Sequence, residues 1–281
     1  MPARSVETLL RGVLDYAGMF PPASLAIGDA MAAYARYRAS AHAWMLGAFV
    51  ISADRLEELD PAIGPVSIVM NAATAADVEP ALRSGRRIRI AAIEFRPVAP
   101  GDVSALAAEV PGNVQAYFEI APDAGLERGL DAVAACGGSA KIRTGGLTPD
   151  AFPSASAIYR FMRACADRGL CAKATAGLHH ALTGRYQVTY EATSASASMY
   201  GFLNVCAAAA LVHAGMTKEE VLPVLAESSP AAFRFDDEGI GWRGYSIPTS
   251  DLAATRQTLF CSFGSCSLQE PIDELKLMRA I

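Results

Sequence analysis

The chain has 281 residues, of which 52% are hydrophobic and 19% are charged, so it is long enough to bury a large core. A net charge of −5 argues against a nucleic-acid partner, because phosphates require a basic surface. The six cysteines form no CxxC pair, and the N-terminus lacks the apolar core of an export signal. These features predict a cytoplasmic protein with reduced thiols.

In chain order, residues 1–40 are expected to form a helical N-terminal extension, which "FPPAS" (20–24) breaks into two helices. From residue 41 to 180, short apolar runs alternate regularly with amphipathic segments. The runs lie at residues 44–52, 66–71, 90–96, 114–120, 139–144 and 170–175. This repetition predicts parallel strands joined by crossover helices. Six consecutive units favour a TIM-type (β/α)8 barrel in the α/β class over an open sheet.

Residues 181–281 are less regular, and we expect them to close the same single domain, which spans residues 1–281. The apolar stretch 199–215 predicts a buried helix rather than a membrane span, since it carries Asn204 and His213. Thr217 and Glu220 have the spacing of a capping box at the start of a helix. Residues 233–244 predict a hairpin, and 259–267 is the candidate for the last strand, while the seventh strand is not located.

The predicted strands have two different faces, because residues two apart in a strand point the same way. In "VQAYFEI" (114–120), Ala116, Phe118 and Ile120 form an apolar face, and Tyr117 and Glu119 lie on the other. The other strands likewise keep one apolar face, while the second face becomes polar near the C-terminal end. A barrel explains this pattern, because its interior opens at the C-terminal mouth, where TIM-barrel enzymes carry their chemistry.

Two lysines, Lys141 and Lys173, end neighbouring strands on the polar face. Mutual repulsion and partial burial are expected to lower the pKa of at least one amine, and a neutral amine attacks carbonyl carbons. Glu94 and Glu119 lie on the same face and are the predicted acid/base residues. The predicted substrate-binding residues are Arg143, Thr144, Thr175, Asn71, His179 and His180.

The segments "KIRTGG" (141–146) and "KATAGL" (173–178) resemble the paired strand-end motifs of deoxyribose-phosphate aldolase-type class I aldolases. The resemblance implies that Lys141 forms a Schiff base and that Lys173 tunes its pKa. It covers about a tenth of the chain, and neither the acidic strand motif nor the phosphate-binding glycines of that family has a clear match. In that family the first lysine lies on the sixth strand. The apolar runs place Lys141 on the fifth, unless a strand is hidden within residues 5–40.

We therefore expect a lyase or aldolase that needs no cofactor and acts on a small carbonyl compound through Lys141 or Lys173. One alternative is a metal-dependent hydrolase or lyase, in which His179 or His180 joins Glu94 or Glu119 around Zn²⁺ or Mn²⁺. Another is a non-catalytic barrel that binds an anionic metabolite. The expected partner is a small molecule, with neither nucleic acid nor membrane, and the sequence leaves open a homo-oligomer.

Two further residues near the predicted mouth stay outside the predicted site. Asp15 in "LDYAGMF" is adjacent to a proline-rich turn, and nothing else in the sequence connects it to the lysines. Cys266 in "GSCS" is expected to be a packed thiol, because no base is adjacent to it in the sequence.

Overall fold

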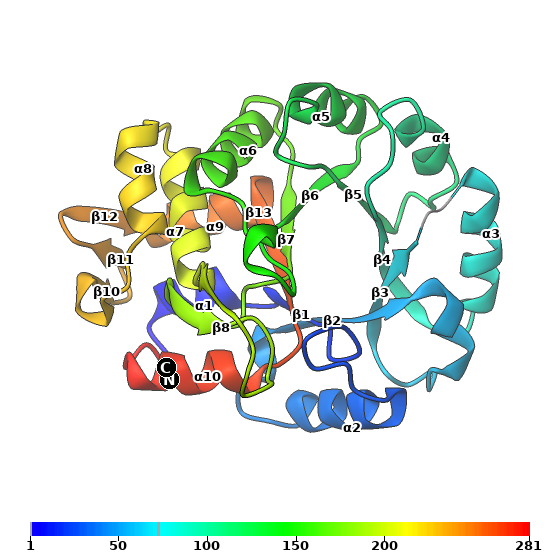
Figure 1. Ribbon diagram of the computed structural model, residues 1–281, viewed down its shortest axis with the longest axis horizontal. Coiled ribbons are helices and arrows are strands. Elements are labelled where there is room, and N and C mark those ends of the chain that lie inside the picture. Colours follow the sequence, from blue (N-terminus) through cyan, green and yellow to red (C-terminus); the bar gives the residue numbers. More distant parts are fainter. Residues whose placement is uncertain (1, 72–73) are drawn as a thin grey trace.

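The computed structural model describes residues 2–71 and 74–281, and its central feature is a closed barrel of eight parallel strands (Figure 1). Strands β1 to β7 follow chain order around the ring, and β13 lies between β7 and β1. The bounds are β1 Leu14–Tyr16, β2 Leu46–Ser52, β3 Pro65–Met70, β4 Arg89–Phe95, β5 Gln115–Glu119, β6 Ser139–Arg143, β7 Ala172–Thr175 and β13 Phe260–Ser265. The predicted α/β class and TIM-type barrel are therefore confirmed.

Helices cover the outside of the ring (Figure 1). Their bounds are α1 Arg4–Leu10, α2 Ile27–Arg38, α3 Ala75–Ser84, α4 Val103–Ala108, α5 Leu126–Ala135, α6 Ala155–Asp167, α7 Phe202–His213, α8 Lys218–Leu225, α9 Thr249–Thr258 and α10 Gln269–Leu277. Short 3-10 turns complete them at η1 Ala43–Met45, η2 Ala53–Glu58, η3 Pro149–Ala151 and η4 Pro230–Ala232. The capping box predicted at Thr217 and Glu220 begins α8.

The strand missing from the prediction is β1, which lies between α1 and α2 and before "FPPAS", so the prediction of a helix up to residue 20 is wrong after Leu10. Its three residues are too few to display an alternating pattern, but they pair with both β2 and β13 and so close the ring. Because β1 adds one strand at the start, Lys141 lies on the sixth barrel strand and Lys173 on the seventh. This is the strand position that the aldolase resemblance implies for Lys141.

A long insertion separates β7 from β13 and explains the irregular end of the sequence. It begins with an antiparallel hairpin, β8 Gly184–Gln187 and β9 Ser196–Met199. After α7 and α8 comes a three-stranded antiparallel sheet formed by β10 Phe233–Phe235, β11 Gly239–Trp242 and β12 Tyr245–Pro248. The predicted hairpin at 233–244 is confirmed. This sheet and α8 lie at the left of the molecule, away from the ring (Figure 1).

The predicted inward and outward faces of the strands are also confirmed. Phe95 on β4 and Phe118 on β5 are fully buried and stack with ring centroids 4.9 Å apart. Both belong to the apolar face, whereas Glu94 and Glu119 belong to the opposite face, which forms the barrel interior. This alternation allows polar side chains inside the ring while helices bury the outer face.

The apolar stretch near residue 200 forms α7, whose residues from Phe202 to Val212 are all buried by neighbouring elements. Among the described residues, none of the helices combines the length and apolar character needed to cross a membrane.

Asn204 on α7 connects the beginning of the insertion to the end of α8. Its Oδ1 accepts a hydrogen bond from the Thr183 amide at 2.9 Å, and its Nδ2 donates to the carbonyls of Val224 and Glu227 at 2.6 and 2.8 Å. Asn204 is completely buried, so no water is available to replace these partners. The side chain therefore has a structural role in holding three segments together.

Replacing Asn204 with leucine should lower the free energy of unfolding by about 3 kcal/mol, because it leaves buried backbone groups without partners. Cys206→Ala is the matched control, since Cys206 is also buried on α7 and its loss should cost about 1 kcal/mol. Urea unfolding followed by circular dichroism measures both. Equal losses in the two variants would contradict the structural role of Asn204.

Candidate active site

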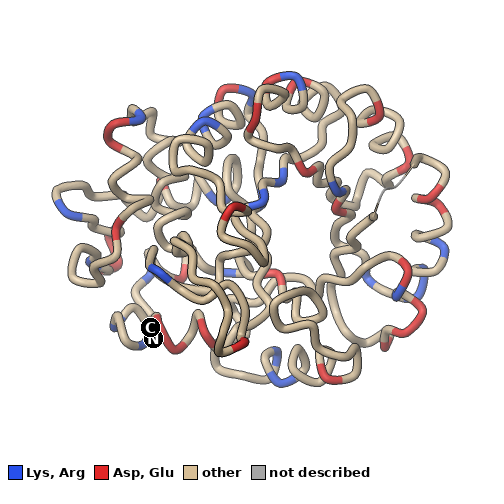
Figure 2. The backbone as a smooth tube through the Cα atoms, in the orientation of Figure 1, with Lys and Arg blue, Asp and Glu red and all other residues tan. Residues whose placement is uncertain are grey.

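The two lysines and Glu119 lie side by side because of strand register. Glu119 on β5 pairs with Lys141 on β6, and Lys141 pairs with Lys173 on β7. Residues in register on neighbouring parallel strands point to the same face, and here that face is the barrel interior. Glu94 on β4 joins them one strand further around the ring. Figure 2 shows acidic and basic positions of this kind along the inside of the ring.

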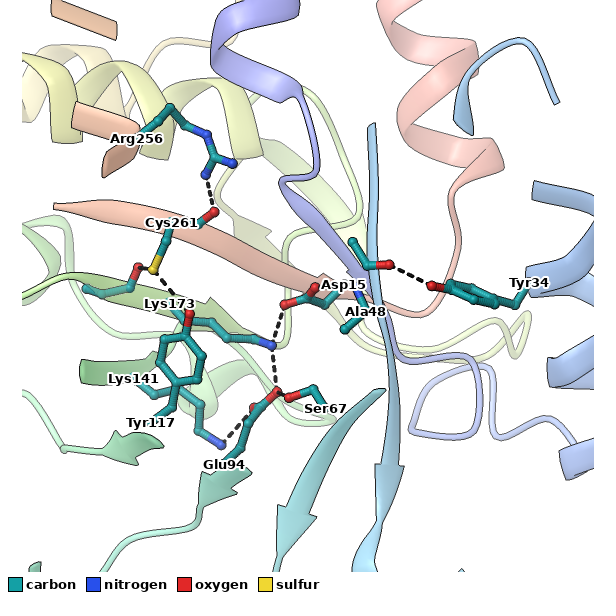
Figure 3. Close-up of polar contacts among 12 residues, drawn as sticks. Asp15, Tyr34, Ala48, Ser67, Glu94, Tyr117, Lys141, Lys173, Arg256 and Cys261 are labelled. Carbon is teal, nitrogen blue, oxygen red and sulfur yellow. Dashed lines mark hydrogen bonds and ion pairs between the residues drawn. The ribbon is translucent and has the colours of Figure 1, made fainter. Parts of the chain in front are cut away.

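Each lysine lies between two carboxylates, and Figure 3 shows Lys173 between Asp15 and Glu94, with Lys141 on the other side of Glu94. The Lys173 Nζ atom is 2.6 Å from Asp15 Oδ2 and 2.5 Å from Glu94 Oε1. The Lys141 Nζ atom is 3.2 Å from Glu94 Oε2 and 3.2 Å from Glu119 Oε2. The two oxygens of Glu94 therefore contact different lysines, so a negative charge lies between the two amines.

Arg143 extends this charged group toward solvent. Its Nε and Nη2 atoms donate to the two oxygens of Glu119 at 3.1 and 3.4 Å, and its side chain is 43% exposed. Three cations, Lys141, Lys173 and Arg143, thus balance the three carboxylates of Asp15, Glu94 and Glu119. Such balance is what burial of this many charges requires, because an unpaired buried charge is strongly destabilising.

The ionisation of Lys173 differs from the prediction. Burial alone would lower its pKa, but the negative charges of Asp15 and Glu94 and their hydrogen bonds outweigh burial and raise it. For Glu94, burial acts to raise the pKa, while Lys173 and Lys141 lower it to about 2. The lowered pKa predicted for at least one amine is therefore not found at Lys173, because carboxylates separate it from the other ammonium group.

Asp15 was missed as a site residue, although it is one of the two carboxylates that contact Lys173. It lies at the centre of β1, and its Oδ1 accepts a hydrogen bond from the Ala48 amide of β2 at 2.7 Å. The signal that could have found it is the short apolar run "VLDYA" (13–17), in which Asp15 is the single charged residue. Recognising this run as a strand would have placed Asp15 inside the barrel.

A cavity of about 580 Å³ opens above this charged group at the C-terminal ends of the strands. Both lysines, Glu94 and Arg143 line it, and so do Arg96 and Thr175. The β8–β9 hairpin forms another part of its wall through Tyr186 to Tyr190 and Met199. Phe20, Pro21 and Pro22 also line it, so the segment between β1 and α2 contributes to the mouth.

The other predicted substrate-binding residues have different positions. Thr144 is buried, and its hydroxyl donates to the carbonyl of Ala176 at 2.5 Å, so it joins the loops after β6 and β7. Thr175 lines the cavity, whereas Asn71 is exposed beyond the end of β3 and is not among the lining residues. The predicted roles of these three residues in substrate binding stay predictions.

The glycines of the two lysine motifs allow these loops to touch. A Cβ atom at Gly145 would lie 2.9 Å from the Cα of Gly177, which is closer than side-chain packing permits. Gly177 and its neighbour Ala176 both have positive φ angles, of 76° and 61°. A left-handed conformation is costly for alanine, so the loop after β7 is held in an uncommon geometry beside the cavity.

His179 and His180 both line the cavity but make different contacts. The His180 Nδ1 atom is 2.6 Å from Glu274 Oε1, and its ring stacks on Tyr186 at a centroid distance of 3.4 Å. The His179 Nδ1 atom lies 3.4 Å from both Ser265 Oγ and Cys266 Sγ. Over the described part of the chain, no three His, Cys, Asp or Glu side chains form a group able to hold a metal ion.

Comparisons of the chain with protein-family models, with curated proteins and with solved structures found no match.

Glu94 should make the stability of the protein depend on pH in a defined range. With a pKa lowered from 4.5 to about 2, its carboxylate stabilises the fold above pH 4.5 and loses this effect as the pH falls toward 2. Glu94→Gln removes the charge between two ammonium groups and should cost about 3–5 kcal/mol at pH 7. The difference in free energy of unfolding between the wild type and Glu94→Gln should shrink by about 2 kcal/mol when the pH is lowered from 5 to 3.

Urea unfolding at the two pH values measures this narrowing. Glu79→Gln is the control, because Glu79 forms an exposed ion pair with Arg83 and should change stability by less than about 1 kcal/mol at either pH. A difference between wild type and Glu94→Gln that stays constant with pH would show that Glu94 is not an ionised partner of the lysines.

Proposed function

We propose that the protein is a lyase of the aldolase type, which forms an imine between Lys141 and a small carbonyl substrate. The observation that carries this proposal is a lysine amine at the floor of a cavity of about 580 Å³, in contact with two carboxylates. A lysine amine that can lose its proton is a nucleophile toward carbonyl carbons. The position of Lys141 on the sixth strand agrees with the resemblance of its motif to class I aldolases.

The contacts favour Lys141 over Lys173 as the nucleophile. Lys173 contacts its two carboxylates at 2.5 and 2.6 Å and its pKa is raised by them, so it stays an ammonium ion. Lys141 is 3.2 Å from each of its carboxylates, so its ion pairs are longer than those of Lys173 and hold the amine less firmly in place. Lys173 then acts as a fixed positive charge that neutralises Asp15 and Glu94.

The carboxylates differ in the roles they can have. Glu94 contacts both lysines and the Ser67 hydroxyl, and its pKa of about 2 makes it a poor base. Glu119 contacts Lys141 and is held by Arg143, which also fixes its orientation. We therefore assign to Glu119 the removal of the proton from Lys141. The neutral amine then attacks the carbonyl carbon to give a carbinolamine. Glu119 returns the proton to its hydroxyl group, which leaves as water and gives the iminium ion.

The cavity suits a substrate with an anionic group near the carbonyl. Arg96 and Arg143 both line it, and Arg143 keeps Nη1 free of the hydrogen bonds that Nε and Nη2 make to Glu119. Arginine pairs well with carboxylate and phosphate groups. The apolar part of the wall, from Phe20, Phe152 and Val188, leaves space for a short carbon chain.

Borohydride reduction in the presence of acetaldehyde, glycolaldehyde, hydroxyacetone or pyruvate tests the proposal. At least one of these carbonyl compounds should add its reduced mass to Lys141, and peptide mass spectrometry can assign the site because the chain has four lysines. Lys141→Met should abolish the adduct. Lys276→Met is the matched control, because it removes a lysine from α10 and should leave the adduct unchanged.

An adduct confined to Lys218 and Lys276 would contradict the proposal, since these lysines lie outside the cavity. No adduct with any probe, combined with stoichiometric bound metal, would favour the metal-dependent alternative. Binding of an anionic metabolite without adduct or turnover would favour a non-catalytic barrel.

A further inference from the structure

A second group of polar side chains lies at the cavity, apart from the lysines. It consists of His179 after β7, Ser265 and Cys266 at the end of β13, Tyr190 in the β8–β9 hairpin and Glu270 on α10. The His179 Nδ1 atom is 3.4 Å from both Ser265 Oγ and Cys266 Sγ. The Tyr190 hydroxyl oxygen is 3.4 Å from Cys266 Sγ and 3.2 Å from Glu270 Oε2.

The single proton of the Ser265 hydroxyl determines the direction of its hydrogen bond with His179. The Ser265 hydroxyl donates to the carbonyl of Ser267 at 2.8 Å, and a hydroxyl has only one proton to give. Ser265 Oγ can therefore only accept from His179. It follows that the Nδ1 atom of His179 carries a proton.

The contacts of Tyr190 also indicate that Nδ1 of His179 carries the proton. Its hydroxyl donates to the Glu270 carboxylate, so its oxygen accepts from the Cys266 thiol. Burial raises the pKa of Cys266, which keeps the thiol protonated. The sulfur is then an acceptor toward His179. Hydrogen bonds thus run in one direction, from His179 through Cys266 and Tyr190 to Glu270.

This orientation leaves Nε2 of His179 as a base. Burial and the neighbouring His180 lower the pKa of His179 to about 4, so the ring is neutral at pH 7 and carries one proton. With that proton on Nδ1, the lone pair is on Nε2. Across the residues that the structure describes, Nε2 has no hydrogen-bond partner, and His179 lines the cavity.

We propose that Nε2 of His179 is the general base that acts on the imine formed at Lys141, with Ser265, Cys266, Tyr190 and Glu270 as positioning residues. This inference rests on the proposed function. In carbon–carbon cleavage, Nε2 takes the proton of the substrate β-hydroxyl, a carbonyl forms there, and the Cα–Cβ bond breaks. The electron pair of the broken Cα–Cβ bond moves to the iminium group to give an enamine. With a substrate that cannot be cleaved, Nε2 removes a proton from the carbon next to the iminium carbon.

The tautomer of His179 can be measured without any substrate. Nitrogen-15 NMR of the histidine-labelled protein at pH 7 should show that His179 is protonated at Nδ1 and unprotonated at Nε2, with His179→Gln assigning the signals. A proton on Nε2 would overturn the inference and would leave the proposed function untouched.

Tyr190→Phe tests the positioning residues in a variant that should fold, because the Tyr190 side chain is largely exposed. Without the Tyr190 oxygen, the Cys266 thiol loses its acceptor and can donate to Nδ1, in competition with the hydrogen bond from Nδ1 to Ser265 Oγ. The His179 proton should then move to Nε2 in a measurable fraction of molecules. An unchanged tautomer in Tyr190→Phe would show that Cys266 and Tyr190 do not orient the ring.

Exchange of deuterium into the trapping probe separates imine formation from proton removal. In D₂O, the probe that gives most adduct should acquire deuterium next to its carbonyl. His179→Gln should still form the Lys141 adduct, but deuterium should exchange into the probe at least about 100-fold more slowly. His213→Gln is the matched control, because His213 lies at the end of α7 beside Thr258 and should exchange at the wild-type rate.

The outcomes distinguish the two proposals. Adduct formation with exchange within about threefold of wild type in His179→Gln would overturn His179 as the base, and would leave Lys141 as the nucleophile. Absence of both adduct and exchange in the wild type would overturn the proposed function, together with the base that depends on it.

Discussion

The constraint on which this structure depends is charge compensation inside the barrel. Two buried lysines are stable there only because Asp15, Glu94 and Glu119 surround them and Arg143 balances the third carboxylate. Strand register produces the arrangement, since it aligns Glu119, Lys141 and Lys173 on one face. The closed ring brings Asp15 from β1 to meet Lys173, although 158 positions separate them in the chain.

Compensation also makes the two lysines chemically different. Lys173 is held at short distances by carboxylates on two sides, while Lys141 has longer contacts and a neighbour, Glu119, that is oriented by an exposed arginine. A single carboxylate, Glu94, contacts both amines and prevents the repulsion that would otherwise act between them. The proposed function uses this difference, with Lys141 as the reacting amine and Lys173 as the permanent charge.

Much of this arrangement could be predicted from the sequence. The features that could not be predicted were missed for physical reasons. The alternation in "VQAYFEI" and "IAAIEFR" correctly predicted that Glu119 and Glu94 face the interior, because strand periodicity is local. β1 has only three residues, too few for periodicity, so Asp15 was missed with it. The contact between His179 and Cys266 joins positions 87 residues apart, so no local sequence pattern predicts it.

The most direct test of the central claim is a crystal structure of the protein reduced with borohydride in the presence of its best carbonyl probe. Continuous electron density from Lys141 Nζ to the probe carbon, with Lys173 still between Asp15 and Glu94, is the result expected here. An unmodified Lys141 with the probe bound only at Arg96 and Arg143 would contradict the claim that this lysine is the nucleophile.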